Sequence, residues 1–200
     1  TLQYHTPELP FGTTASFAYG QTKKDGNSAN SQNSTNGDNG TFYSLVSKPI
    51  DGLTVSASLY EIEDYDDGLT NETQLEEGGA WGVEYAIANV TLGYGKSYNA
   101  PTTTAAVTAG ATTVEYYENT GMSIGFAVND QLSVSYTTET SEQNFQTSST
   151  ASTDIDMDSI QAAYNLGGAT LSIARTDYEN IGYADGADAT DTIIALTFAF

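Results

Sequence analysis

Alternation of apolar and polar residues recurs along most of the chain, and it limits the possible folds more than any other feature. Between Leu53 and Leu59, for example, every second residue is apolar and the intervening residues are Thr or Ser. Successive side chains of a β-strand point to opposite faces of a sheet, so this pattern is typical of a strand with one apolar and one polar face. No segment of comparable length has helical spacing. The sequence therefore predicts an all-β protein.

The alternating segments are separated by clusters of Gly, Asn, Asp, Ser and Pro, which are typical of turns and loops. Counting the segments predicts about eleven strands in a single domain that covers residues 1–200. A partial strand at 1–6 precedes strands near 13–22, 41–48, 53–62, 80–88, 90–98, 113–128, 131–140, 154–165, 168–178 and 191–200.

The predicted connectors alternate strictly between short and long. The short ones are 48–52, 88–89, 129–130 and 166–168, and the long polar ones are 23–40, 64–78, 99–112, 141–153 and 179–190. In an up-and-down antiparallel arrangement, all tight turns then lie at one end, which is typical of transmembrane β-barrels of the outer membrane. A soluble β-sandwich also has alternating strands, but it needs no such asymmetry between its ends. We expect the barrel and keep the sandwich as the alternative.

Composition excludes several classes of protein. The chain has 26 acidic and five basic residues and a formal net charge of -21, which argues against binding nucleic acid, because that binding depends on Lys and Arg. It has no cysteine, so neither disulfides nor a thiolate zinc site is possible. No apolar run approaches the roughly 18 residues of a membrane-crossing helix. If the protein spans a membrane, we expect it to do so with strands.

Tyrosine is the commonest aromatic residue, and eight tyrosines fall on the apolar face of the predicted strands. Amphipathic rings favour the boundary between membrane and water, and outer-membrane barrels carry aromatic girdles at both boundaries. We therefore expect the apolar face to meet lipid or a neighbouring subunit, and the polar face to line a lumen. The eight are Tyr4, Tyr19, Tyr43, Tyr85, Tyr94, Tyr98, Tyr136 and Tyr164.

Two motifs carry a resemblance to a known family. Residues 194–200 read Ile-Ala-Leu-Thr-Phe-Ala-Phe, and residues 2–12 read Leu-Gln-Tyr-His-Thr-Pro-Glu-Leu-Pro-Phe-Gly. The first resembles the last strand of Gram-negative general porins, and the second is similar to the turn that follows their channel-constricting loop. The pattern of the C-terminal third resembles porins of marine alphaproteobacteria.

The resemblance implies a bacterial outer-membrane protein that forms a water-filled, passive diffusion channel for small hydrophilic solutes. It further implies contact with outer-membrane lipid, a homotrimer, and an assembly signal that the outer-membrane assembly machinery reads at Phe200. The residues of that signal are Ile194, Leu196, Phe198 and Phe200.

The number of predicted strands indicates whether they could form a whole barrel. Porin barrels hold about 16 to 18 strands, and single-chain bacterial barrels have even numbers. Eleven strands therefore suggest the C-terminal part of a 16-stranded barrel, without its first strands and its constriction loop. A complete ten-stranded barrel with residues 1–11 as a tail is the competing interpretation.

Carboxylates and hydroxyls in the polar phase of the strands are the candidate pore-lining residues. A negative lumen favours cations, so we expect a mild cation preference. Ile155 and Met157 are apolar at odd positions whereas Ile160 and Ala162 are apolar at even positions, which predicts a bulge near Asp158. The candidates are Glu84, Glu139, Ser56, Ser58, Ser133, Ser135, Asp154, Asp156 and Asp158.

Nothing in the sequence indicates an enzyme, a cofactor site or a metal site. His5 is the only histidine, and we expect Asp185, Asp188 and Asp191 to be a solvated acidic loop. Lys96 and Arg175 continue the apolar face of their strands, so we expect them at an outer rim, at a subunit contact, or beyond a bulge that flips the phase. The alternative function is a soluble or surface-attached all-β structural or binding protein whose acidic loops form the working surface.

Overall fold

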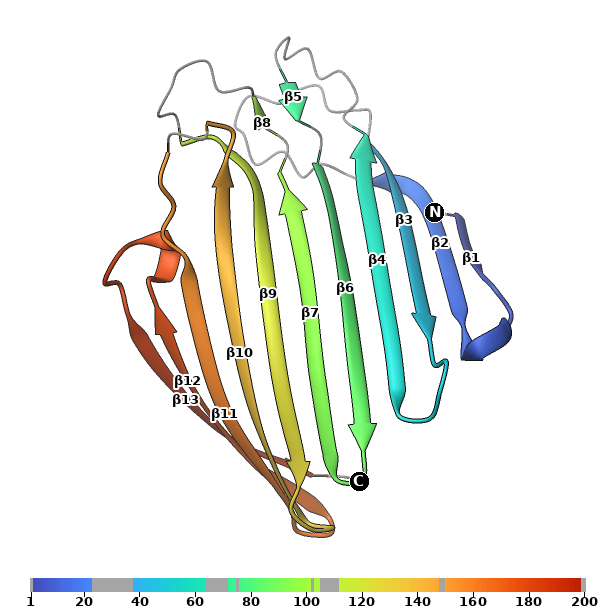
Figure 1. The fold of residues 1–200 in the computed structure, drawn as a ribbon, viewed down its shortest axis with the longest axis vertical. Helices are drawn as coiled ribbons and strands as arrows, with labels where there is room; N and C mark the ends of the chain where they lie inside the picture. The colour runs from blue at the N-terminus through green and yellow to red at the C-terminus, as the bar shows by residue number, and fades with distance from the viewer. Residues whose placement is uncertain are drawn as a thin grey trace.

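A computed structural model describes residues 2–22, 38–63, 72–74, 76–101, 103–104, 112–147 and 150–198. Within them, eleven antiparallel strands form one sheet, and its strands follow one another in chain order (Figure 1). They are β1 (Leu2–His5), β2 (Thr14–Thr22), β3 (Asp38–Ser47), β4 (Leu53–Glu63), β6 (Glu76–Ile87), β7 (Val90–Ala100), β9 (Val114–Ala127), β10 (Leu132–Phe145), β11 (Ile155–Asn165), β12 (Ala169–Glu179) and β13 (Ala189–Phe198).

The eleven predicted strands are confirmed in number, order and approximate position. Their ends differ mainly on the side of the long connectors, where β3 begins at Asp38, β6 begins at Glu76 and β10 continues to Phe145. These extensions lack clean alternation, but they pair through their backbones, as Glu61 does opposite Glu77. Backbone pairing does not depend on side-chain pattern, which is why alternation missed these ends.

Four short elements were not predicted. β5 (Glu72–Gln74) and β8 (Thr103–Thr104) form a separate two-stranded sheet, and two 3-10 turns, η1 (Pro10–Gly12) and η2 (Ile181–Tyr183), lie in connectors. Among the described residues, no helix is long and apolar enough to cross a membrane.

The tight turns lie together at one end of the sheet, and the strands joined by long connectors leave from the other (Figure 1). Local chemistry closes these turns. The Asn129 side-chain oxygen accepts hydrogen bonds from the backbone nitrogens of Gln131 and Leu132, each at 2.9 Å. The Asn165 side chain accepts one from the Gly167 nitrogen at 2.7 Å. The predicted end-to-end asymmetry is therefore confirmed for the described strands.

Within the described ranges of the chain, no second layer covers the apolar side of the sheet. Among the described residues, only Gly40, Gly78, Ala100 and Ser159 are buried, and no large side chain is fully buried. Phe126 and Leu171, which a sandwich would place in a dry interior, are 40% and 43% exposed. The described residues therefore do not form a β-sandwich.

The sheet is curved but open. Figure 1 shows that it curls away from the viewer towards β12 and β13, while β1 and β13 remain its two edges. What is established is an up-and-down antiparallel sheet, because no pairing between β1 and β13 closes it.

Candidate functional site

Small and polar side chains share one face of the sheet. One cross-strand row on this face contains Thr54, Glu84, Gly93, Ser123, Thr137 and Ser159, each directly opposite the next, from β4 to β11. Because side chains alternate, the neighbouring rows two residues away along the strands lie on the same face. The polar phase of the sequence is thus a continuous surface across many strands.

This small, polar face is the concave one. A hollow of about 490 Å³ is lined by residues of β7, β9, β10, β11, β12 and β13 on this face. One hollow can touch so many neighbouring strands only where the sheet bends around it. Its lining includes Thr91, Gly125, Ser135, Gln161 and Ala174. We call this the concave face and its opposite the convex face.

Glycines widen the middle of the concave face. Gly82, Gly95 and Gly121 stand directly opposite one another in three neighbouring strands. At Gly93, an added Cβ atom would lie 2.5 Å from the Ser123 hydroxyl oxygen, so that hydroxyl would have to move. A glycine within a strand costs about 0.5–1 kcal/mol relative to alanine, so this set favours space over local stability.

The structure places Glu84 and Glu139 on the concave face. Glu84 is exposed and lines a second hollow of about 330 Å³, and Glu139 lies opposite Gly121 and Met157. They are separated by three strand spacings, which is roughly 14 Å across the sheet. The two carboxylates therefore contribute separate negative charges to one concave surface.

The four serines predicted to line a pore also lie on the concave face. Ser133 and Ser135 line the hollow of about 490 Å³, and Ser56 lines that of about 330 Å³. Ser58 lines a third hollow of about 360 Å³ near β1 to β4. These hydroxyls provide hydrogen-bonding groups without filling the concavity.

Asp154, Asp156 and Asp158 do not lie with these residues. The β10–β11 and β11–β12 registers are continuous past Asp158, so the predicted bulge is absent. Without it, Met157 shares the concave face with Glu139, and Asp156 and Asp158 take the convex phase, whereas Asp154 lies just before β11. There the Thr140 hydroxyl donates to Asp156 at 2.7 Å, and the Tyr136 hydroxyl donates to Asp158.

The convex face divides into two zones. Nearer the tight turns lies an apolar band of exposed side chains, and the eight predicted tyrosines share its phase. The band includes Leu59, Trp81, Leu92, Tyr94, Met122, Ile124, Phe126, Val134, Tyr136, Ile160, Tyr164, Leu171, Ile173, Ile194, Leu196 and Phe198.

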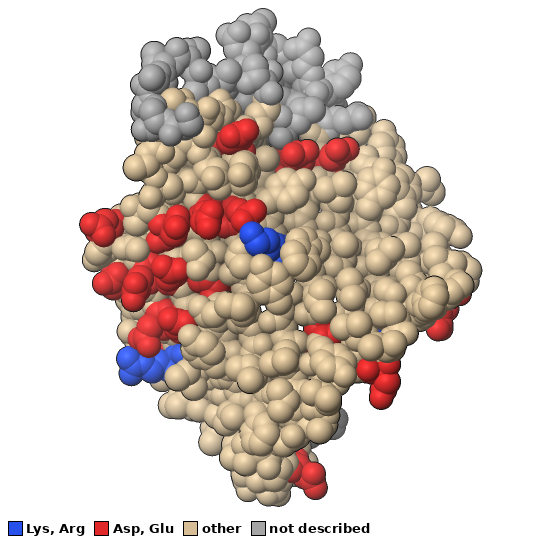
Figure 2. Space-filling view, in the orientation of Figure 1, with Lys and Arg blue, Asp and Glu red and all other residues tan. Residues whose placement is uncertain are grey.

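Beyond the apolar band, towards the long connectors, the convex face is acidic. Figure 2 shows acidic side chains gathered in this direction, over the upper left of a largely uncharged surface. We call this zone the acidic band, and it consists of Glu118, Glu142, Asp156, Asp158, Asp177 and Glu179.

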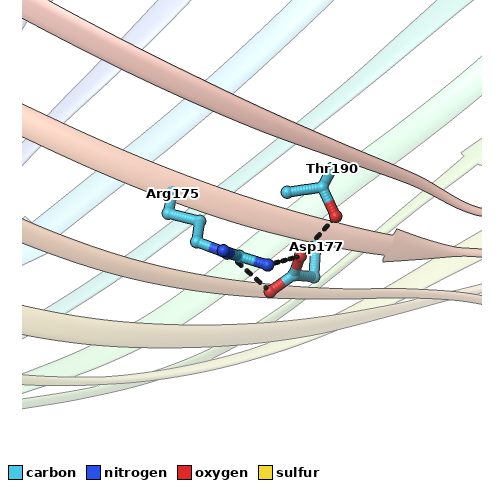
Figure 3. A network of polar contacts seen from close by, with 3 residues as sticks. All are labelled: Arg175, Asp177 and Thr190. Carbon is cyan, nitrogen blue, oxygen red and sulfur yellow. Dashed lines mark hydrogen bonds and ion pairs between the residues drawn. The ribbon is translucent and has the colours of Figure 1, made fainter.

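Lys96 and Arg175 lie on the convex face as predicted, and each is paired with a carboxylate of the acidic band. Lys96 Nζ is 2.7 Å from Glu118, and an Arg175 guanidinium nitrogen is 3.1 Å from Asp177. The Thr190 hydroxyl also donates to Asp177 (Figure 3). The Thr190 hydrogen bond, followed by the Arg175 interaction, lowers the pKa of Asp177, which lies beyond the apolar band.

The terminal strand carries the predicted assembly residues on the convex face. Ile194, Leu196 and Phe198 are 69%, 51% and 56% exposed. Phe200 lies outside the described residues, as do Asp64, Asp66 and Asp67 of the long 64–78 connector. β13 pairs with β12 along one side and is the last strand of the sheet among the described residues.

Sequence reasoning missed one set of concave-face residues, which are large. Phe42, Tyr60 and Tyr117 occupy the polar phase of their strands. A signal was present, because each is one of two consecutive large residues, with Tyr43, Leu59 and Tyr116 on the other face. In such a pair, one of the two large side chains must point to the polar face of the sheet.

Fold and site together define an open, single-layered, up-and-down β-sheet with a polar concave face and an apolar convex face. No protein-family model matches the chain, and no curated protein matches it at a significant level.

Proposed function

We propose that the chain is part of an outer-membrane channel through which small hydrophilic solutes diffuse passively. The observation that carries this proposal is the exposed apolar band on the convex face of a sheet whose described residues form no core. Exposed apolar area costs about 25 cal/mol per Å² in water, so a continuous band calls for an apolar neighbour. Hydrocarbon is the neighbour that fits a convex surface with tyrosines in the same phase.

Strand length supports the same proposal. Apart from the four-residue β1, the strands of the sheet are 9 to 14 residues long. A tilted strand needs about 9 to 11 residues to cross a bilayer, and a barrel has short turns at one end and long loops at the other. Both features favour a bilayer-spanning arrangement.

The concave face would then border the water. Its hydroxyls and glycines leave space for solutes, and Glu84 and Glu139 would favour cations mildly. Further strands at the edges of β1 and β13 would complete a barrel of about 16 strands, as the resemblance to general porins implies. A homotrimer in the bacterial outer membrane, assembled through the terminal phenylalanine, belongs to this proposal.

One observation favours a second candidate function. The acidic band faces outward rather than into the concavity, so it could serve as a contact surface for a basic partner of a soluble or surface-attached protein. That function would require the apolar band to be covered without detergent.

Conductance across a planar lipid bilayer tests the channel. The protein purified in detergent should give stepwise current increases, with a reversal potential in a KCl gradient that indicates mild cation preference. The double substitution Glu84→Gln and Glu139→Gln should shift that potential towards non-selectivity, whereas Asp156→Gln, on the convex face, should not. A protein that stays dispersed without detergent and gives no current would contradict the channel.

A further inference from the structure

A row of aromatic and amide side chains crosses the concave face, and passive diffusion alone does not explain it. Phe42, Tyr60, Gly78, Asn99 and Tyr117 stand opposite one another in turn from β3 to β9. Gln143 in β10 is opposite Tyr117 and extends the row. We call the residues Phe42, Tyr60, Asn99, Tyr117 and Gln143 the aromatic row. These rings face away from the apolar band, and the described part of the chain has no buried core that receives them.

The rings at the β3–β4 end are held in place. Phe42 and Tyr60 stack with centroids 6.0 Å apart and planes inclined by 21°. The Asn99 amide donates a hydrogen bond to the Tyr60 hydroxyl. The Tyr60 ring also lies over Gly78, where an added Cβ atom would come within 2.5 Å of it. A platform fixed in advance loses less entropy when a ligand binds.

The other end of the row is also supported. The Gln143 amide donates to the Tyr117 hydroxyl at 3.4 Å, and the Tyr117 ring lies 5.6 Å from that of Tyr183. Tyr183 comes from the β12–β13 connector, and its hydroxyl forms a 2.9 Å hydrogen bond with the Ser141 hydroxyl. Its φ of 59° is unfavourable for a residue with a side chain. The connector therefore accepts backbone strain while placing an aromatic ring beside this face.

The stacked pair borders the third hollow of the concave face. This hollow measures about 360 Å³, near the lower limit of ordinary small-ligand sites, which start at about 300 Å³. None of the described residues that line it is Asp, Glu, Lys or Arg. Its polar lining consists of Gln3, His5, Ser16, Ser44 and Ser58.

The lining selects the class of ligand. An anion would find no Lys or Arg and a metal cation no carboxylate. The Ser16 and Ser44 hydroxyls bond each other, but a wholly apolar solute would offer no partner to Gln3, His5 or Ser58. A pyranose ring has one C–H face that suits the negative face of an aromatic ring, and an edge of hydroxyls that both donate and accept hydrogen bonds. We propose that this hollow is a binding subsite for a neutral sugar and that the aromatic row continues the contact surface across the sheet. The proposal rests on the proposed function, since it names the class of solute that the channel takes.

Saturation-transfer NMR and calorimetry on the detergent-solubilised protein, with methyl β-D-glucopyranoside and maltotriose as probes, test the subsite. Phe42→Ala should weaken sugar binding about tenfold, because it removes half of the ring platform. Tyr43→Ala is the matched control, since the adjacent residue points to the convex face and packs on Phe17 at 5.3 Å. Tyr60→Phe keeps the ring and should weaken binding less than Phe42→Ala.

The same preparations should be tested for conductance, so that the two proposals fail separately. Conductance without sugar binding, or equal weakening by Phe42→Ala and Tyr43→Ala, overturns the subsite and leaves the channel intact. Sugar binding that depends on Phe42 in a protein without conductance supports the subsite and contradicts the channel. Circular dichroism of each variant identifies loss of fold. If an alanine variant does not fold, sugar binding is compared between Tyr60→Phe and Tyr43→Phe instead.

Discussion

Asp177 shows how two neighbours hold one carboxylate on the convex face. The Thr190 hydroxyl and the Arg175 guanidinium favour its charged form and lower its pKa. Thr190→Val should therefore raise the pKa of Asp177 towards the ordinary aspartate value, as read by carboxyl-carbon NMR. Because the folded pKa is lowered, its contribution to stability is present above the ordinary aspartate pKa and is lost as the pH falls. Thr192→Val, opposite Arg175, is the control, and equal effects of both variants would contradict this assignment.

At the scale of residues, the sequence located most of the concave-face candidates. Glu84, Glu139 and the four serines follow the polar phase, and the structure places them there. Asp154, Asp156 and Asp158 were misplaced because polarity was given more weight than phase. Strict alternation from Ile160 backwards puts Asp158 and Asp156 on the convex face, and Asp154 lies just before the strand. The convex face is acidic at these positions because β11 extends beyond the apolar band.

At the scale of elements, the β3–β4 turn depends on one glycine. Gly52 has a φ of 77°, and an added Cβ atom would lie 2.1 Å from the Ala86 carbonyl oxygen. Gly52→Ala should therefore lower the free energy of unfolding by about 1–3 kcal/mol, from backbone strain and a forced separation of β4 and β6. Denaturant unfolding followed by circular dichroism measures the change. Gly168→Ala, in the β11–β12 turn with no atom within 4 Å, should change it little, and equal losses would contradict the argument.

Alternation and turn composition together were sufficient to predict the eleven strands. They could not predict β5 and β8, whose two or three residues carry no periodicity. Nor could they predict that the β12–β13 connector brings Tyr183 to Tyr117. These residues are far apart in the sequence, and the curvature of the sheet brings them together. The conformation of a connector depends on tertiary contacts, whereas the alternation that assigns the faces of a strand is present in the strand's own residues.

At the scale of the whole molecule, the sheet separates two environments. The convex face exposes large apolar side chains, and the concave face carries hydroxyls, amides, aromatic rings and carboxylates, among them Glu84, Glu139 and Asp191. A soluble sheet would bury one of these faces against another layer. The curvature gives the apolar face the larger perimeter, as a wall around water and within lipid requires. Whether the sheet closes into a barrel could not be predicted from the alternation of residues. Alternation indicates which face of a strand a side chain lies on, but not which strands pair with the two edge strands.

The chain's single tryptophan tests which solvent meets the convex face. Trp81 lies in the apolar band, is 46% exposed and packs on Tyr94 with centroids 5.5 Å apart. In reconstituted vesicles its emission should be blue-shifted and quenched strongly by lipids with brominated acyl chains, and weakly by aqueous iodide. Lipid must lie against the indole for this result, because bromine quenches only at short range.

The control moves the indole through the sheet. Ser58 lies opposite Ala80, next to the Ala57–Trp81 pair, so Trp81→Phe with Ser58→Trp keeps the indole at a similar level on the concave face. Iodide should then quench more strongly than brominated lipid. If iodide quenches Trp81 as strongly as it quenches the indole at position 58, the convex face lies in water. That result would exclude the proposal that the sheet separates lipid from a water-filled lumen. A reversal of quenching between the two proteins would assign the two faces to lipid and to water.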